Sequence, residues 1–340
     1  MKSKLSPTNR DTLKSLLCSR GEEAQCLRDC AARTSEELFG RAIFLRGLIE
    51  TSSYCRNNCL YCGLRRDNSS AERYRLTESQ ILDCCKVGYQ AGLHTFVLQG
   101  GEDSYWSDSR LVPLIKQIAT TYPDAAITLS LGERSAESYK ALYDAGATRY
   151  LLRHEAANQT LYEAIHTTDM SYNNRIEAIK NLMQIGYQTG MGMMIGIPGQ
   201  TDDDIVDDLQ LIATLRPQMV GIGPFIPHPA TPYAKHPAGD IDKVLNAVAI
   251  TRLLLPNALI PATTALSTLS AEGHRLGILA GANVIMPNLS PADVRSKYAI
   301  YAGKAATGTE AVEGIKTLEA EISAIGYTIN YAKADYNDTI

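Results

Sequence analysis

Three cysteines, Cys55, Cys59 and Cys62, stand close together in the segment Cys-Arg-Asn-Asn-Cys-Leu-Tyr-Cys. At this spacing, three thiolates can face a common point only if the segment is a loop. A structural zinc site needs a fourth ligand, usually a nearby Cys or His, and none follows at a suitable spacing. An iron–sulfur cubane normally takes four cysteines, so three leave one iron open to a bidentate amino acid. Three buried thiols without metal, or an incomplete zinc loop, are the alternatives.

The remaining cysteines are predicted to be structural. They are Cys18, Cys26, Cys30, Cys84 and Cys85, and no cysteine follows Cys85. Cys26 and Cys30 share a helix face at i, i+4, which is compatible with a metal site, although buried helix cysteines explain the spacing equally simply. Cys84 and Cys85 lie inside a helix predicted over 77–91, where core packing is expected for at least one of them. Because no secretory signal is visible, a disulfide framework is not expected.

Short apolar segments alternate with amphipathic ones along most of the chain. Strands are predicted over 43–49, 95–99, 126–131, 150–153, 189–195, 219–225, 259–263 and 284–286. Helices are predicted over 77–91, 109–121, 135–145, 172–185, 202–215, 241–254, 268–280 and 309–324. This alternation predicts an α/β fold, a single (β/α)8 TIM-type barrel whose site lies where the strands end. A doubly wound open sheet is the alternative, but no Gly-x-Gly-x-x-Gly follows the first strand.

The predicted organisation has three parts. Residues 1–40 form an N-terminal helical extension, residues 41–304 the barrel, and residues 305–340 a C-terminal helix and polar tail. The chain has 340 residues and a formal net charge of −4, which argues against binding nucleic acid through bulk charge. No apolar stretch is long enough to span a membrane. Since the N-terminus also lacks a signal peptide, we expect a cytoplasmic protein.

The cysteine spacing, with Tyr61 before the last cysteine, resembles the radical S-adenosylmethionine (SAM) superfamily. That resemblance implies a [4Fe–4S] cluster on Cys55, Cys59 and Cys62 whose open iron binds SAM. It further implies that one electron from the cluster splits SAM into methionine and a 5′-deoxyadenosyl radical. Gly100, Gly101 and Glu102 are similar to the Gly-Gly-Glu turn of the superfamily, which meets the SAM amino group. An ordinary Gly-Gly turn is the alternative for this segment.

The resemblance also implies further contacts with SAM. These residues are Ser130, Arg153, Glu155 and Arg175, and the glycine stretch 192–199 is similar to the segment that contacts adenine. Arg175 can pair with the methionyl carboxylate, and Glu155 can accept hydrogen bonds from ribose hydroxyls or an ammonium. For Arg153 and Glu155, a structural ion pair at the barrel rim is the alternative.

Longer phrases resemble the [FeFe]-hydrogenase maturases of the HydE family. They are 59–68, 150–155, 220–229, 260–265 and 282–288, so the similarity covers nearly the whole chain. The resemblance implies a cavity inside the barrel for an anionic substrate, lined by Arg46, Gln99, Thr128, Thr263, Thr264, Met286, Tyr298 and Tyr301. Threonines bonded to backbone in the core are the alternative. Many members carry a second cluster motif near the C-terminus, and this chain has no cysteine there.

The implied task is a step in assembling the diiron subcluster of the hydrogenase. The implied substrate is small and organometallic or amino-acid-derived, an Fe(CO)2(CN)–cysteine complex supplied by another hydrogenase maturase. Ferredoxin or flavodoxin is the expected electron donor, and neither nucleic acid nor membrane is an expected partner. Methylornithine synthase and biotin synthase share the scaffold and are alternative enzymes. An iron–sulfur scaffold or redox sensor without catalysis is the alternative of another class.

Overall fold

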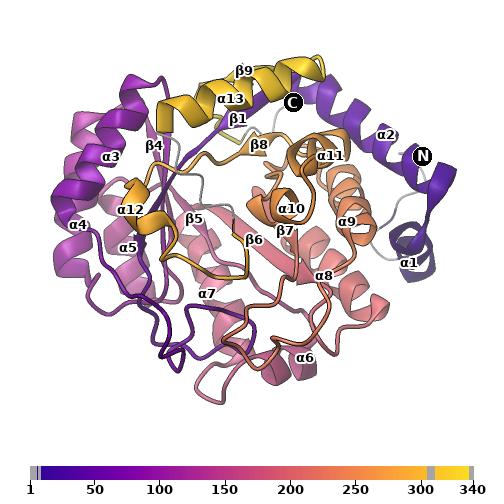
Figure 1. The fold of residues 1–340 in the computed structure, drawn as a ribbon, viewed down its shortest axis with the longest axis horizontal. Helices are drawn as coiled ribbons and strands as arrows, with labels where there is room; N and C mark the ends of the chain where they lie inside the picture. Colours follow the sequence, from indigo (N-terminus) through magenta and orange to yellow (C-terminus); the bar gives the residue numbers. More distant parts are fainter. Residues whose placement is uncertain (1–5, 7–8, 305–310, 337–340) are drawn as a thin grey trace.

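Parallel strands form the centre of the computed structural model, which describes residue 6 and residues 9–304 and 311–336 (Figure 1). The larger sheet has the order β2-β3-β4-β5-β6-β7 and the smaller one the order β8-β1-β9, and every pairing is parallel. The strands are β1 (Ala42–Leu45), β2 (Gly47–Ser52), β3 (Thr95–Gly100), β4 (Ala126–Ser130), β5 (Arg149–Leu151), β6 (Gln188–Ile195), β7 (Met219–Pro224), β8 (Val284–Ile285) and β9 (Thr328–Asn330).

Backbone hydrogen bonds close these strands into a ring. The Val220 amide donates to the Leu259 carbonyl at 3.1 Å, and the Ala262 amide donates to the Val284 carbonyl at 2.9 Å. The Leu48 amide then donates to the Pro287 carbonyl at 2.8 Å, which returns the ring to β2. Eight staves result, counting β1 and β2 as one and the segment 259–262 as another, and the predicted (β/α)8 barrel is confirmed.

Two of the predicted strands differ from the structure. The segment 259–263 makes only the single bridges Met219 to Leu259 and Pro261 to Val284. Pro261 has no amide hydrogen, so a continuous ladder is interrupted there. The predicted strand 43–49 is divided at Arg46, because β1 pairs with β8 and β9 while β2 pairs with β3.

Helices surround the ring on the outside (Figure 1). They are α1 (Arg10–Cys18), α2 (Gly21–Phe39), α3 (Glu78–Gln90), α4 (Asp108–Thr121), α5 (Ala136–Asp144), α6 (Gln159–Ile165), α7 (Tyr172–Ile185), α8 (Asp202–Leu215), α9 (Ile241–Leu254), α10 (Thr264–Leu269), α11 (Gly273–Leu279), α12 (Ala292–Arg295) and α13 (Ala311–Ala324). The predicted capping box is present, with Thr77 accepting from the Gln80 amide at the start of α3. The predicted helix 268–280 is instead two short helices, α10 and α11, and they pack so closely that a Cβ on Gly273 would collide with the backbone of Leu266.

Both ends of the chain pack against the barrel. The helices α1 and α2 lie along α8 and α9, where the Asn246 amide group donates to the carbonyls of Leu17 and Ser19 at 3.0 Å. The predicted polar tail contains a strand that was not predicted, β9, which pairs with β1. Residues 305–310 and 337–340 lie outside the described residues, and the domain limits at 40/41 and 304/305 stay predictions.

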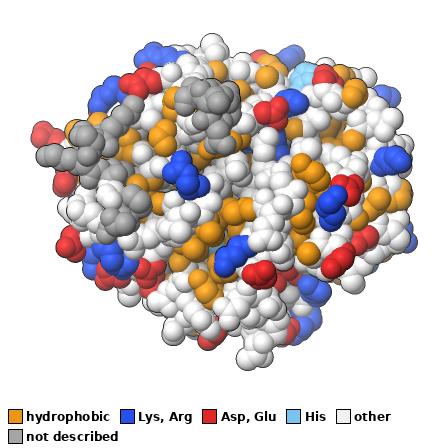
Figure 2. Space-filling view, turned by 180° about the vertical axis from the view of Figure 1, so that it is seen from behind, with side chains coloured by type: hydrophobic (Ala, Val, Ile, Leu, Met, Phe, Trp, Pro, Cys, Tyr) orange, Lys and Arg blue, Asp and Glu red, His pale blue; other side chains and the backbone are white. Residues whose placement is uncertain are grey.

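The surface carries charges of both signs. On the face seen in Figure 2, Lys and Arg side chains are interspersed with Asp and Glu, and no broad area has a single sign. Within the described ranges, no helix is both long and apolar enough to cross a membrane.

Candidate active site

The cysteine loop follows β2 and lies at the C-terminal mouth of the barrel. Cys55, Cys59 and Cys62 are half-buried. Burial raises the pKa of all three thiols, that of Cys62 to about 12, and the neighbouring cysteine thiols raise the pKa values of Cys59 and Cys62 further. The three thiols are therefore protonated when no metal is bound, and binding a metal there must displace their protons.

The arrangement of Cys55, Cys59 and Cys62 distinguishes between a single zinc ion and an iron–sulfur cluster as the bound group. No three His, Cys, Asp or Glu side chains in the described part of the chain converge closely enough to bind one metal ion. The loop is therefore not arranged as a zinc site, in which all ligands reach the same ion at about 2.0–2.3 Å. Three thiols on one loop that do not converge on a single ion are compatible with a cubane cluster, in which each cysteine binds a different iron.

A hydrogen-bond relay fixes Tyr61 within this loop. The His166 ring accepts from the Tyr61 hydroxyl at Nε2 (3.0 Å), while its Nδ1 lies 2.8 Å from the Tyr162 carbonyl. A carbonyl only accepts, so Nδ1 carries the hydrogen and Nε2 is free to accept from Tyr61. Burial lowers the pKa of His166 to about 4, which keeps the ring neutral. The relay therefore holds the aromatic ring that precedes the third cysteine in one orientation.

A cavity of about 350 Å³ opens beside the loop at the ends of the strands. It brings together residues predicted for SAM and residues predicted for substrate. From the first group it is lined by Cys59, Tyr61, Cys62, Gly100, Ser130, Arg153 and Glu155. From the second group it is lined by Gln99, Thr263, Thr264, Met286, Tyr298 and Tyr301. One cavity thus places both predicted ligands side by side.

Arg153 and Glu155 follow β5 and point polar atoms at this cavity. Their side chains form an ion pair at 3.4 Å, yet Arg153 Nε and Glu155 Oε2 are buried without a hydrogen-bond partner among the described residues. Glu155 has a φ of +66°, a left-handed conformation that non-glycine residues rarely adopt. Buried polar atoms are normally paired, so these two fit a site that a polar ligand completes.

The residue between them anchors the segment from behind. His154 Nε2 lies 3.1 Å from Asp208 Oδ1 on α8, and both side chains are fully buried. The Ala157 amide donates to the same oxygen at 2.6 Å. Burial raises the pKa of Asp208. The sequence analysis did not single out this pair, because its two members are 54 positions apart.

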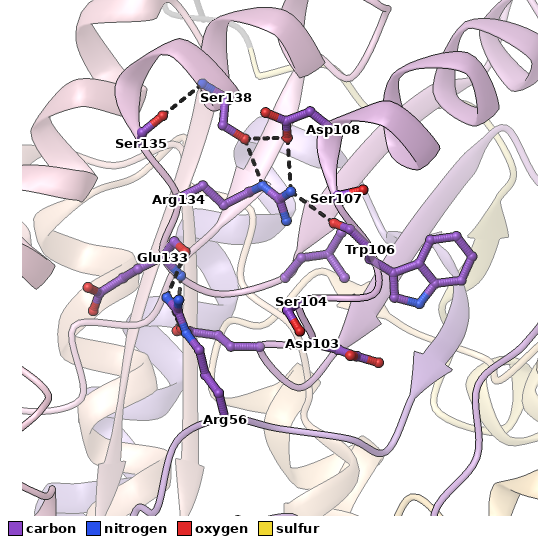
Figure 3. A pocket seen from close by; sticks show the side chains of 12 residues that line it. Arg56, Asp103, Ser104, Trp106, Ser107, Asp108, Glu133, Arg134, Ser135 and Ser138 are labelled. Atoms are coloured by element: carbon purple, nitrogen blue, oxygen red, sulfur yellow. Dashed lines mark hydrogen bonds and ion pairs between the residues drawn. The ribbon is translucent and has the colours of Figure 1, made fainter.

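Three residues predicted to contact SAM lie outside the lining of the cavity. Arg175 donates to Glu133 Oε1 at 2.5 Å and to the Arg153 carbonyl at 2.6 Å, so it supports Arg153 from outside the cavity. Glu102 borders a neighbouring groove, which Figure 3 shows with Arg56 and Glu133 among its labelled residues. Glu102 accepts from Arg56 Nε and from the Glu133 amide, both at 3.0 Å. Gly101 packs against the loop, since a Cβ there would collide with the Tyr54 carbonyl.

Two residues predicted to line the substrate cavity do not lie on its wall. Arg46 is buried with Nη1 2.9 Å from Met219 Sδ, and its Nε and Nη2 have no hydrogen-bond partner among the described residues. Burial lowers the pKa of Arg46, and the nearby Arg149 lowers it further. Thr128 is also buried, and its hydroxyl has no hydrogen-bond partner within the described ranges.

The cavity wall contains an ion pair that the sequence analysis missed. Lys304 Nζ donates to Glu50 Oε1, and Asn288 Nδ2 donates to Glu50 Oε2 at 3.0 Å. Burial lowers the pKa of Lys304, an effect that Glu50 opposes. Lys304 Nζ also lies 4.5 Å from the centre of the Tyr298 ring. A Glu directly after the apolar residues Leu48 and Ile49 was the one available signal.

Comparisons with known proteins identify the family of the chain. A profile of the Radical SAM superfamily matches residues 49–212. The chain is 47% identical over 265 residues to the [FeFe] hydrogenase maturase subunit HydE of Thermotoga maritima, covering 78% of this chain and 75% of that protein. It is 29% identical over 286 residues to 3-methylornithine synthase of Methanosarcina acetivorans, covering 83% and 80%.

Solved structures give the same fold. The crystal structure of methylornithine synthase (PylB) superposes with a TM-score of 0.82 at 25% identity, covering 96% of this chain and 94% of that one. The structure of HydG, a maturase of the [FeFe]-hydrogenase, superposes with a TM-score of 0.79 at 20% identity, covering 98% and 79%, which shows the fold alone.

Proposed function

Since the chain belongs to the radical SAM superfamily, we propose that it works in [FeFe]-hydrogenase maturation, as HydE does. The chain is an enzyme, and its family uses a [4Fe–4S] cluster and SAM. The observation that carries the finer proposal is the 47% identity to HydE over 265 residues. The proposed substrate is a small iron complex with carbonyl, cyanide and cysteine ligands, which another maturase supplies.

The loop cysteines are the proposed cluster ligands. Cys55, Cys59 and Cys62 would hold three irons and leave the fourth open, next to the cavity that Cys59 and Cys62 line. When both cofactors are bound, the cluster supplies one electron and SAM supplies a carbon-centred radical. Tyr61, fixed by His166, closes the loop side of the cavity.

The proposed SAM contacts lie on the strand ends. Glu155 Oε2 is an acceptor for a hydroxyl or ammonium, and the Arg153 guanidinium is a donor for a carboxylate. Arg175 and His154 act through these two: Arg175 donates to the Arg153 carbonyl, and His154 pairs with Asp208 behind them. Gly100 and Ser130 complete the lining on neighbouring strands.

The proposed substrate residues line the same cavity. Gln99, Thr263, Thr264, Tyr298 and Tyr301 provide hydrogen-bonding groups there, and Met286 provides an apolar one. The Tyr298 hydroxyl already accepts from Gln99 at 3.4 Å. Such a wall orients a small polar ligand beside the reacting carbon and keeps bulk water away from it.

Anaerobic reconstitution tests the proposal. Protein loaded with iron and sulfide is given SAM, a reductant and a synthetic iron–carbonyl–cyanide–cysteine complex, and the product is offered to a hydrogenase that lacks its diiron subcluster. We expect 5′-deoxyadenosine, consumption of the complex and hydrogen evolution by the hydrogenase. Conversion of lysine to methylornithine, or of dethiobiotin to biotin, would contradict the maturase proposal. A cluster that changes redox state but yields no 5′-deoxyadenosine would indicate a sensor instead.

A further inference from the structure

An exposed stack of tyrosine and arginine side chains lies directly beside the cysteine loop. We name it the Tyr–Arg patch and define it as Tyr54, Arg75, Tyr105 and Arg110. The Arg75 guanidinium carbon lies 3.8 Å from the centre of the Tyr54 ring and 5.0 Å from that of Tyr105, and the Arg110 carbon lies 4.2 Å from the Tyr105 ring. The four side chains therefore form one continuous stack.

Large exposed apolar side chains are rare elsewhere on the molecule. Among the described residues, Tyr54, Tyr105 and Val87 are the three that qualify, and two of these belong to the Tyr–Arg patch. Tyr and Arg are the residue types that contribute most strongly at the centres of protein interfaces. The composition of the patch is therefore that of an interface.

Buried carboxylates hold the patch in place. Asp103 accepts from Arg75 at 2.6 and 2.9 Å, from the Ser52 hydroxyl at 2.6 Å and from the Tyr105 amide at 3.1 Å. This carboxylate connects β2, Arg75 and the loop after β3, so the stack is rigid before any partner arrives. A preorganised surface loses less conformational entropy on binding than a flexible one.

The same arrangement turns positive charge outward. The Arg75 side chain is 35% exposed while its partner Asp103 is 2% exposed, and Arg56 is 64% exposed while Glu102 is 10% exposed. Arg110 is 45% exposed and pairs only loosely, at 3.7 Å, with Glu78. Arg56 and Glu102 line the groove next to the patch (Figure 3). The Arg56 and Arg75 guanidinium groups thus stand at the surface above the Glu102 and Asp103 carboxylates, which suits an acidic partner, while Arg110 lies beside Glu78, whose side chain is 50% exposed.

The position of the patch relative to the three cysteines indicates which acidic partner it fits. Tyr54 directly precedes Cys55, and within the described residues the substrate cavity is lined by Cys59 and Cys62 but not by Cys55. The cysteine loop therefore has one side toward SAM and substrate and another side toward the patch. A partner on the patch approaches the cluster site without blocking the cavity.

We infer that the Tyr–Arg patch docks a small acidic one-electron carrier protein, and that electrons enter the cluster site from the side of Cys55. In that step the reduced carrier loses one electron and the cluster site gains it, with no bond made or broken and no proton moved. The inference rests on membership of the radical SAM superfamily, not on the maturase substrate.

The test compares a protein carrier with a small reductant, using the reconstituted full chain. An acidic bacterial ferredoxin is the probe. Its Kd for the chain is measured by biolayer interferometry at two ionic strengths. The formation of 5′-deoxyadenosine is measured once with reduced ferredoxin and once with dithionite as the reductant. Arg110→Glu and Tyr105→Ala should each weaken ferredoxin binding about tenfold and slow ferredoxin-driven cleavage similarly. Dithionite-driven cleavage should stay unchanged. Arg33→Glu, on the exposed face of the distant α2, is the matched control and should bind ferredoxin as the unsubstituted chain does.

Several results would overturn the inference. The inference is wrong if the patch variants bind ferredoxin as tightly as the unsubstituted chain, or if Arg33→Glu weakens ferredoxin binding as much as they do. It is also wrong if the patch variants slow the dithionite-driven cleavage of SAM as much as the ferredoxin-driven cleavage. A patch variant that changes the oligomeric state but not ferredoxin binding would assign the surface to a second copy of the chain. These measurements can be interpreted even if the proposed maturase substrate does not react, because they depend only on ferredoxin binding and SAM cleavage.

Discussion

The two ends of the β5 stave carry arginines with different surroundings, one fully buried and one half-buried. At its start, Arg149 is fully buried, and its Nη2 donates to the carbonyls of Lys333 and Ala334 and to Asp335 Oδ1 at 2.7, 3.0 and 2.9 Å. Just past its end, Arg153 has the ion pair with Glu155, and its Nε has no hydrogen-bond partner among the described residues. The C-terminal segment thus covers the floor of the barrel.

This difference separates stability from function along one stave. Burying a guanidinium without partners is costly, and at the floor the C-terminal segment supplies three acceptors to Arg149 Nη2, although Arg149 Nε has no hydrogen-bond partner among the described residues. At the mouth the chain leaves polar atoms unpaired around a cavity, where a ligand can complete them. Substitutions at the floor should therefore change the free energy of unfolding, whereas those at the mouth should change ligand binding.

The largest effect is expected at the cysteine loop. Cys59→Ala removes one proposed cluster ligand, so 5′-deoxyadenosine formation should fall below detection while the protein stays folded. Iron content, the EPR spectrum and SAM cleavage are measured after anaerobic reconstitution. Cys84→Ala is the matched control, because Cys84 is buried in α3 away from the cavity, and it should retain most of the activity. SAM cleavage by the Cys59 variant would show that the cluster assignment is wrong.

A floor substitution should act on stability alone. Arg149→Met removes the guanidinium that three groups of the C-terminal segment accept from, and the expected loss is about 2–4 kcal/mol in the free energy of unfolding. The Kd for SAM, measured by calorimetry below the unfolding transition, should not change. Lys140→Met on the exposed surface of α5 is the control and should cost much less, since its ion pair with Asp144 is solvent-exposed. A weaker Kd for SAM in Arg149→Met would contradict the separation of floor and mouth.

A substitution at the mouth of the barrel should weaken SAM binding and leave the free energy of unfolding nearly unchanged. Glu155→Gln keeps the size of the side chain but removes its charge, and we expect the Kd for SAM to rise about tenfold, which corresponds to about 1.4 kcal/mol. The free energy of unfolding should change little, because the ion pair with Arg153 that is lost spans 3.4 Å and the Arg153 side chain is 32% exposed. Glu163→Gln on the exposed side of α6 is the control. Unchanged SAM binding would make Arg153 and Glu155 a structural pair, the alternative considered from the sequence.

Features that depend on neighbouring residues were predictable from the sequence. The cysteine loop, the Gly100–Gly101 turn and the capping of α3 are each encoded within a few positions, and alternating apolar segments indicated the barrel. The depth of side chains inside the barrel was not predictable in this way. Alternation shows which side chains point inward, but a strand rises about 3.3 Å per residue. Arg46 therefore lies below the cavity, while Glu50, farther along the same stave, lies on its wall.

Pairings between distant positions were also outside the reach of the sequence. Glu50 and Lys304 are 254 positions apart, and Arg175 and Glu133 are 42 apart. The eight staves bring these groups together only once the ring is closed. Closure itself relies on single bridges at Leu259 and Pro261, where the apolar pattern predicted a full strand. Apolar character marks burial in such a segment, but the missing amide of proline limits its pairing.

The smallest expected effect concerns pH and the relay behind Tyr61. Burial lowers the pKa of His166 from 6.5 to about 4 in the folded chain, so the ring is neutral when folded. Well above pH 6.5 the ring is neutral in both the folded and the unfolded chain, so it does not change the free energy of unfolding. Below pH 6.5 the unfolded chain binds a proton that the folded chain does not bind, which lowers the free energy of unfolding. Between pH 7.5 and 6 this costs about 0.8 kcal/mol of stability. His166→Gln cannot titrate, so the difference between its free energy of unfolding and that of the unsubstituted chain should shrink by this amount over the same interval. Denaturant titrations of both proteins at the two pH values measure it, and parallel pH profiles would show that the folded ring is not held neutral.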